Sequence, residues 1–275
     1  MAANVLLVED VAYLIDCGYG AAGALARQGI SLRDIEGIFI THNHADHLMD
    51  YGAVLLFAWL QGHTAPVRVY GPPPLEKITA WQLAANQVPL DYYKNDMGMA
   101  GMPQVIVREC SGRRVVMHDA HVRVSCTEVH HPPVKPALAY RFDLEDRSIV
   151  FSGDTSASQD LVTLAKGADV LVHEAADVDM TLKMMSDPTA RGMINGSGGG
   201  APAGFDARKF SEHVYNGHTS AEDAGRIAAA AEVKTLVLNH LSPGSSRVVT
   251  DSQWISMARR HFSGNIVVGH DGLTL

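Results

Sequence analysis

Short apolar runs bounded by turn residues recur along the whole chain. Val5–Val8, Gly37–Ile40 and Val67–Tyr70 have the length and the apolar content of strands. The same pattern predicts further strands at Tyr13–Asp16, Val105–Val107, Arg114–Val116, Val122–Val124, Ala139–Phe142, Ile149–Phe151, Val170–Val172, Leu236–Leu238 and Ile266–Val268. Glu9 and Asp10 separate the first two runs and indicate a turn.

Three longer stretches favour helices. Ala21–Gln28 stops at Gly29, a residue typical of helix C-terminal caps. Leu48–Leu60 is apolar almost all round, which predicts a buried helix. A third helix is expected at Ala221–Ala231. Helical and extended segments therefore alternate along the sequence.

Strands in both halves with helices between them predict an α/β fold. We expect two sheets covered by helices, an αββα four-layer sandwich, in one domain that spans residues 1–275. Residues 191–205 are rich in glycine and serine, and we interpret them as a flexible loop within that domain.

Composition narrows the class of protein. Hydrophobic residues make up 47% of the 275 residues and charged residues 19%, which is typical of a soluble globular protein. The net charge of −8 argues against a broad basic surface for nucleic acid and leaves a local basic patch open. Three widely spaced cysteines, no membrane-length apolar run and no basic N-terminal region favour a cytoplasmic location without membrane contact.

The chemistry is concentrated in the segment Thr41–His47. His42 and His44 are two residues apart, so on an extended chain they point the same way and can share a cation. Asp46 and His47 follow at the start of the next turn or helix. Imidazole and carboxylate ligands suit Zn²⁺, with Mn²⁺ and Fe²⁺ as alternatives. The alternative interpretation is a solvated histidine-rich loop.

Two later strands end in residues of the same kind. Asp154 comes shortly after the strand Ile149–Phe151, and His240 shortly after Leu236–Leu238. A polar side chain at the tip of an apolar strand is costly unless something coordinates it or bonds to it. We therefore expect these two side chains to join the metal ligands.

These motifs resemble the metallo-β-lactamase superfamily, with its T-H-x-H-x-D-H segment, its G-D-T segment and its final histidine. The resemblance implies two zinc ions. One would be held by His42, His44 and His131, the second by Asp46, His47 and His240, with Asp154 bridging both. The neighbouring His130 is the alternative to His131, which we prefer because the segment His131-Pro132-Pro133-Val134 resembles the family's.

Two further segments, Gly217-His218-Thr219-Ser220 and His173-Glu174-Ala175, resemble the tRNA 3′-processing endonuclease branch (tRNase Z) and its arylsulfatase and phosphodiesterase relatives. The resemblance implies that His218 is the catalytic acid, that Glu174 orients it and that Asp46 lies close by. The alternative places His218 beside a helix start capped by Thr219 or Ser220. We interpret His173 as structural and Asp16 as a residue that steadies a ligand.

The substrate is the least determined feature of the sequence. Only two strands and a turn fit between His131 and Asp154, so the long tRNA-binding arm of the tRNase Z branch is absent. With the acidic composition, this argues against a nucleic acid and favours a small aryl phosphodiester or sulfate ester. Ring opening of an amide or lactone, including β-lactams, and a non-catalytic metal-binding module are the alternatives. The resemblance also implies a homodimer, and a strand ahead of Asn4 that this sequence lacks.

Overall fold

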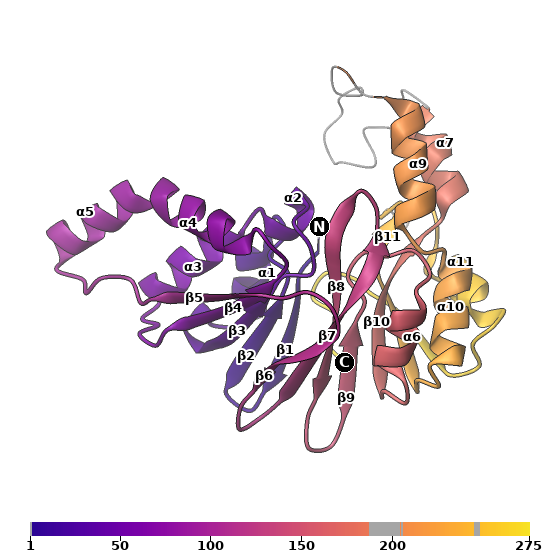
Figure 1. The fold of residues 1–275 in the computed structure, drawn as a ribbon, viewed down its shortest axis with the longest axis horizontal. Helices are drawn as coiled ribbons and strands as arrows, with labels where there is room; N and C mark the ends of the chain where they lie inside the picture. The colour runs from indigo at the N-terminus through magenta and orange to yellow at the C-terminus, as the bar shows by residue number, and fades with distance from the viewer. Residues whose placement is uncertain (1, 187–203, 205, 245–247) are drawn as a thin grey trace. The chain divides into compact units, whose positions relative to one another are not determined.

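The computed structural model describes residues 2–186, 204, 206–244 and 248–275, and it divides into two compact units. The first unit comprises Met1–Gly112 with Thr274–Leu275, and the second comprises Arg113–Leu273. Each unit contains one sheet with its own helices (Figure 1). The expected α/β class is confirmed, whereas the single domain over residues 1–275 stays a prediction.

The sheet of the first unit has five strands in the order β1-β2-β3-β4-β5. β1 and β2 form an antiparallel hairpin around the predicted turn at Glu9 and Asp10, and the other neighbours are parallel. The strands are β1 (Asn4–Val8), β2 (Val11–Ile15), β3 (Ile35–Phe39), β4 (Val67–Gly71) and β5 (Val105–Glu109).

The helices of the first unit are only partly those expected. The apolar stretch Leu48–Leu60 is divided by a turn at Met49 and Asp50, so that its first part belongs to a separate short helix. Gly29 follows the end of the first helix with a φ of 71°, as its predicted capping position requires. The elements are α1 (Ala21–Arg27), η1 (Leu32–Asp34), α2 (Ala45–Leu48), α3 (Tyr51–Leu60), α4 (Leu75–Ala85) and α5 (Gln87–Met97).

The core of the first unit lies between the middle strands and the helix α3. Leu14, Ile38 and Val69 from three neighbouring strands pack with Tyr51 and Val54 of α3, and all five are almost fully buried. This burial removes apolar surface from water and stabilises the parallel strand order. The strand β3 is thereby fixed where it leads into the histidine-rich segment.

The sheet of the second unit has seven strands in the order β12-β11-β10-β9-β8-β7-β6. The strands β9 to β12 are parallel, and β6 to β9 are antiparallel. The strands are β6 (Arg114–His118), β7 (Arg123–His131), β8 (Val134–Asp143), β9 (Ser148–Phe151), β10 (Val170–Ala176), β11 (Thr235–Ser242) and β12 (Asn265–Val268).

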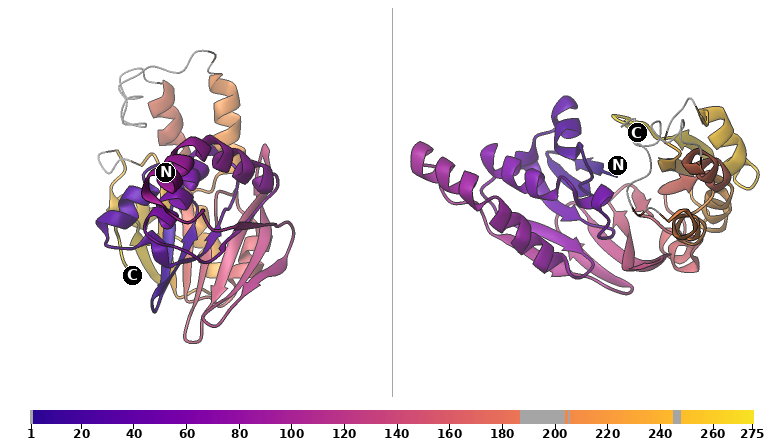
Figure 2. Two further views of the ribbon diagram at one scale, coloured as in Figure 1. Left: turned by 90° about the vertical axis from the view of Figure 1, so that its left-hand side faces the viewer. Right: turned by 90° about the horizontal axis from the view of Figure 1, so that it is seen from above.

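Helices α10 and α11 pack on the parallel strands of this sheet, and α6 packs against β7 and β8 (Figure 1). Figure 2 shows the same unit from two other sides. Leu171 and Leu236 from the sheet pack with Leu161, Ile227 and Trp254 from these three helices. The helices are α6 (Gln159–Ala165), α7 (Val178–Ser186), α9 (Ala207–Gly217), α10 (Ala221–Ala230) and α11 (Asp251–Arg259). The core fixes the ends of β9, β10 and β11, which carry the candidate site.

Two further expectations concern the whole chain. The glycine- and serine-rich segment 191–205 lies outside the described residues except for Gly204. Among the helices that the structure describes, none combines the length and the apolar character needed to cross a membrane. A cytoplasmic location stays a prediction.

Candidate metal centre and acid pair

The histidine-rich segment of the first unit begins where β3 ends. The imidazoles of His42 and His44 converge, with Nε2 of His42 3.0 Å from Nδ1 of His44. His42 is buried and His44 is half-buried, and α2 begins directly afterwards at Ala45. The two ring nitrogens lie close together, and their sharing of one cation stays a prediction.

His47 is held by a buried carboxylate at the end of β2. Asp16 Oδ2 lies 2.8 Å from His47 Nδ1, and Asp16 Oδ1 accepts a hydrogen bond of 2.8 Å from the backbone N–H of Thr41. Since the carboxylate accepts, His47 Nδ1 donates and Nε2 keeps its lone pair, 3.7 Å from Asp46 Oδ2. The contact expected of Asp16 with a ligand candidate is present.

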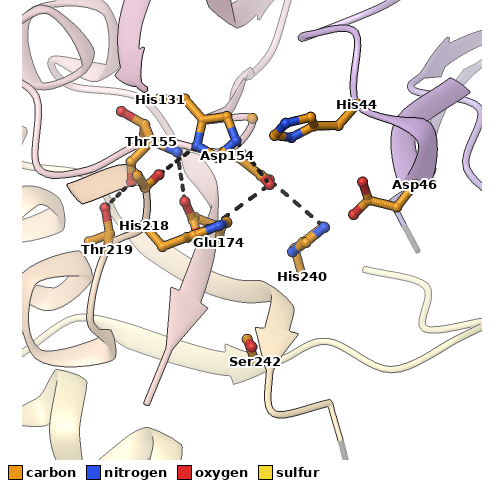
Figure 3. A network of polar contacts seen from close by, with 12 residues as sticks. His44, Asp46, His131, Asp154, Thr155, Glu174, His218, Thr219, His240 and Ser242 are labelled. Carbon is orange, nitrogen blue, oxygen red and sulfur yellow. Dashed lines mark hydrogen bonds and ion pairs between the residues drawn. The ribbon is translucent and has the colours of Figure 1, made fainter. Parts of the chain in front are cut away.

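In the second unit, Asp154 lies between two imidazoles (Figure 3). Its Oδ2 is 3.9 Å from His131 Nε2, and its Oδ1 is 3.9 Å from His240 Nε2. Asp154 and His131 are buried, and His240 is half-buried. The three side chains come from the segment after β9, from the end of β7 and from β11.

These separations fit a shared metal ion better than direct hydrogen bonds. A protein hydrogen bond to oxygen spans at most about 3.2 Å from nitrogen. Two ligands of one Zn²⁺ are at most about 4.2 Å apart, because each bond is about 2.0–2.2 Å long. Both distances at Asp154, 3.9 Å, fall between these limits. The donor set therefore fits a divalent metal, without selecting zinc.

A bulge directs His240 toward the site. In the ladder of β10 and β11, Glu174 pairs with Asn239 and Ala175 pairs with Leu241, so His240 is the extra residue. Its φ of 44° lies in the left-handed region, which is costly for a side chain with a Cβ. The strand β11 continues past this ligand candidate to Ser242.

The neighbouring histidines at the end of β7 have different surroundings. His131 is buried, and its Nδ1 lies 2.6 Å from the carbonyl oxygen of Gly217. Since a carbonyl only accepts, Nδ1 carries the proton and Nε2 presents its lone pair on the side of Asp154. The His130 residue is exposed. This geometry suits His131 as the ligand, which stays a prediction.

The expected pair of His218 and Glu174 is hydrogen-bonded. His218 Nδ1 is 2.8 Å from Glu174 Oε2, and the backbone N–H of Thr155 donates to Glu174 Oε1 at 2.6 Å (Figure 3). Burial raises the pKa of the Glu174 carboxyl, and the His218 imidazole acts in the opposite direction. Both carboxylate oxygens are engaged, which fixes the orientation of the imidazole.

The helix cap that was the alternative interpretation of this segment is also formed. Ser220 caps α10 by accepting a hydrogen bond from the backbone N–H of Asp223. Thr219 donates its hydroxyl to the backbone oxygen of Thr155, next to Asp154. Helix capping and the placement of His218 therefore coexist in adjacent residues.

The imidazole of His173 is buried on the strand β10. Its Nδ1 lies 2.7 Å from the backbone oxygen of Glu174, and burial lowers the pKa of His173 to about 4. A neutral, fully buried imidazole that donates to a backbone carbonyl agrees with the structural role predicted for it.

His213, on α9, was not among the residues predicted for the site. Its ring centre is 5.2 Å from that of His131 and 5.2 Å from that of His218. The residue belongs to none of the motifs that singled out the other histidines. The signal available was its place on the same helical segment as Gly217-His218, five residues before the predicted acid.

Comparison with known proteins places the chain in a family. Residues 12–241 match the model of the β-lactamase superfamily domain. The chain belongs to the β-lactamase superfamily. Proteins named Ribonuclease Z from Mycolicibacterium paratuberculosis and Mycobacterium avium are each 30% identical over 94% of this chain and 85% of their own length.

Solved structures show the same fold. The metallo-β-lactamase fold protein YhfI from Bacillus subtilis and the short form of human tRNase Z each have a TM-score of 0.66. Their sequence identities to this chain are 18% and 20%, and each likeness covers 99% of this chain and 90% of the other. The protein is a metal-dependent hydrolase of the metallo-β-lactamase fold, and the resemblance seen in the sequence is confirmed.

One prediction from the sequence is wrong. Acidic composition and the short interval between His131 and Asp154 led us to expect that nucleic acid is not a partner, yet the relatives named Ribonuclease Z match the chain over most of their length. Net charge sums over the whole surface and says little about a local site, where bound divalent cations reverse the sign of the field.

Proposed function

We propose that the protein is a zinc-dependent phosphodiesterase that cleaves RNA. The observation that carries the proposal is the hydrogen bond of 2.8 Å between His218 and Glu174, with His218 Nδ1 4.0 Å from Asp154 Oδ2. The name Ribonuclease Z of the most similar relatives cited above points to RNA as the substrate class.

The ligands proposed for two zinc ions are those implied by the sequence: His42, His44, Asp46, His47, His131, Asp154 and His240. When bound, the two metals would supply an activated water near neutral pH and offset the negative charge of the phosphate. All seven positions carry side chains that can coordinate a metal, which argues against a non-catalytic member that has lost ligands.

The residues His218 and Glu174 supply the proton that the reaction needs. A sugar oxygen is a poor leaving group, so its departure from phosphorus requires an acid. Glu174 accepts from His218 Nδ1, which leaves Nε2 to hold the proton for the leaving oxygen. The carboxylate also stabilises the positive charge of the protonated imidazole.

The substrate class distinguishes this proposal from its rivals. Opening an amide or lactone ring depends less on a separate acid, so the acid pair is better suited to an ester with a poor leaving group. A small aryl phosphodiester requires the same chemistry and therefore serves as a reporter for the metal-dependent step. An aryl sulfate and a β-lactam serve as test substrates for the two alternative activities, sulfate-ester hydrolysis and ring opening.

The test is a substrate panel with zinc-loaded protein. We expect cleavage of a tRNA precursor with a 3′ extension and of bis(p-nitrophenyl) phosphate, both abolished by a chelator. The panel includes p-nitrophenyl sulfate and a chromogenic β-lactam. Turnover of the sulfate or the β-lactam without cleavage of either phosphodiester would contradict the proposal. Cleavage of the small phosphodiester alone would retain the phosphodiesterase chemistry and exclude tRNA precursors as the substrate.

A further inference from the structure

The C-terminal half of α9 is tied to the turn between β7 and β8 by two reciprocal hydrogen bonds. His213 Nδ1 of the helix lies 3.1 Å from the backbone oxygen of Pro132 in the turn. In the opposite direction, His131 Nδ1 lies 2.6 Å from the backbone oxygen of Gly217, the last residue of the helix. In each pair the imidazole donates and a backbone carbonyl accepts.

The turn itself is rich in proline. Pro132 and Pro133 stand between His131, the last residue of β7, and Val134, the first of β8. Neither proline has a backbone N–H, so this segment offers few donors of its own to satisfy its carbonyls. His213 supplies a donor from outside the hairpin, directly after the residue proposed to bind metal.

A glycine stands at the end of α9, where the helix approaches the turn closely. A Cβ on Gly217 would lie 3.2 Å from His131 Nδ1 and 3.3 Å from the backbone oxygen of Pro132. These distances are shorter than ordinary van der Waals contacts, so a side chain there would push against the imidazole or the turn. The small residue at the end of α9 therefore allows the helix and the turn to approach closely.

The next residue after this contact is His218. The ring centres of His131 and His218 are 5.0 Å apart, and the interplanar angle of 75° places the rings edge to face. Movement of α9 relative to the turn would therefore shift a metal ligand and the proposed acid together. The contact between α9 and the turn therefore affects the positions of both His131 and His218.

We propose that His213 is a positioning residue that holds the turn carrying His131 and, through the close contact at Gly217, keeps this ligand aligned with His218. The inference rests on the proposed metal-dependent function and deepens it. Replacement of a residue that orients a metal ligand typically lowers metal affinity or activity about 10–100-fold.

The first test is metal affinity without substrate. Zinc affinity of the full-length protein is measured by competition with a chelator for wild type, His213→Ala and His213→Asn. We expect His213→Ala to lower the affinity about 10–100-fold. The amide of asparagine can donate to Pro132 in place of Nδ1, so His213→Asn should restore most of it. The d–d spectrum of cobalt-loaded His213→Ala should also change, because the coordination of His131 is altered.

Glu212→Ala provides the matched control on the same helix. Glu212 is exposed and pairs with Arg208 one turn away, so its loss should leave metal affinity and the cobalt spectrum unchanged. Equal affinities for His213→Ala and Glu212→Ala would overturn the inference. So would a loss in His213→Asn as large as that in His213→Ala, because the imidazole itself would then be required instead of the hydrogen bond.

Gly217→Ala tests the same contact while His213 is retained. We expect weaker zinc binding in this variant, and full affinity would count against the inference even if His213→Ala failed to fold. Failure of the proposed function has a different signature. Wild-type protein that binds zinc without cleaving RNA would remove the substrate assignment, whereas the affinity series would still decide the role of His213.

Discussion

The two units present their ligand candidates in contrasting ways. In the first unit, all four come from one continuous segment that runs from the end of β3 into α2, and one buried carboxylate, Asp16, supports it. In the second unit, His131, Asp154, His240 and the acid pair come from separate elements, and backbone carbonyls, a bulge and a close helix contact position them. A continuous motif needs little support, whereas a dispersed site depends on the fold.

Substitutions at the end of β7 should have the largest effect and test the dispersed site most directly. We expect His131→Ala to lose metal and to lower kcat/KM by about 10³-fold or more, since bound metal contributes several kcal/mol to transition-state stabilisation. His130→Ala should leave both unchanged, because the His130 residue is exposed. Metal analysis and kinetics on the two variants measure this, and the reverse result would exchange the two assignments.

His218→Ala separates the acid from the metal ligands. We expect unchanged metal content and a loss in kcat of about 10²–10⁴-fold for RNA, the usual contribution of a general acid. Bis(p-nitrophenyl) phosphate should be affected less, because p-nitrophenolate leaves readily without a proton. Metal analysis and steady-state kinetics with both substrates check the prediction. A fall in metal content would instead make His218 a ligand.

Zinc affinity should depend less on Asp16, which supports the continuous segment of the first unit, than on His213, which supports the dispersed ligands of the second. Asp16→Asn keeps the size of the side chain and removes the charge behind His47, so we expect zinc affinity to fall about 10-fold, the lower end of the usual range. Chelator competition measures the change. A larger loss than in His213→Ala would show that the continuous segment depends on its support as much as the dispersed site does.

The smallest predicted effect concerns the pH dependence of stability. His173 has its pKa lowered from 6.5 to about 4, so below pH 6.5 the unfolded chain takes up a proton that the fold does not. Stability should therefore be complete above pH 6.5 and decline toward pH 4, by roughly 2 kcal/mol between pH 7 and pH 5 from this group. Urea unfolding of metal-free wild type and His173→Asn should show a weaker pH dependence in the variant; equal dependence would contradict the assignment.

Most strands were predictable because their apolar runs are buried in the two cores. Helices α4 and α5 were overlooked, because few of their residues are buried and the apolar periodicity is weak. Helix α9 was also missed, although its apolar and polar residues alternate with a clear helical period, because Val214 and Gly217 are the buried residues on it. With that helix, the positioning contact of His213 was missed as well.

The sequence by itself determined the fold class, the family and the types of side chain at the site, because ligand-bearing residues stand in motifs at the ends of apolar strands. It could not determine the surroundings of each side chain. Only the tertiary structure buried His131 against Gly217 and left His130 exposed, turned His240 out of the ladder and brought His218 to Glu174. These contacts join residues far apart in the chain, and their geometry depends on how helices and strands pack rather than on local pattern.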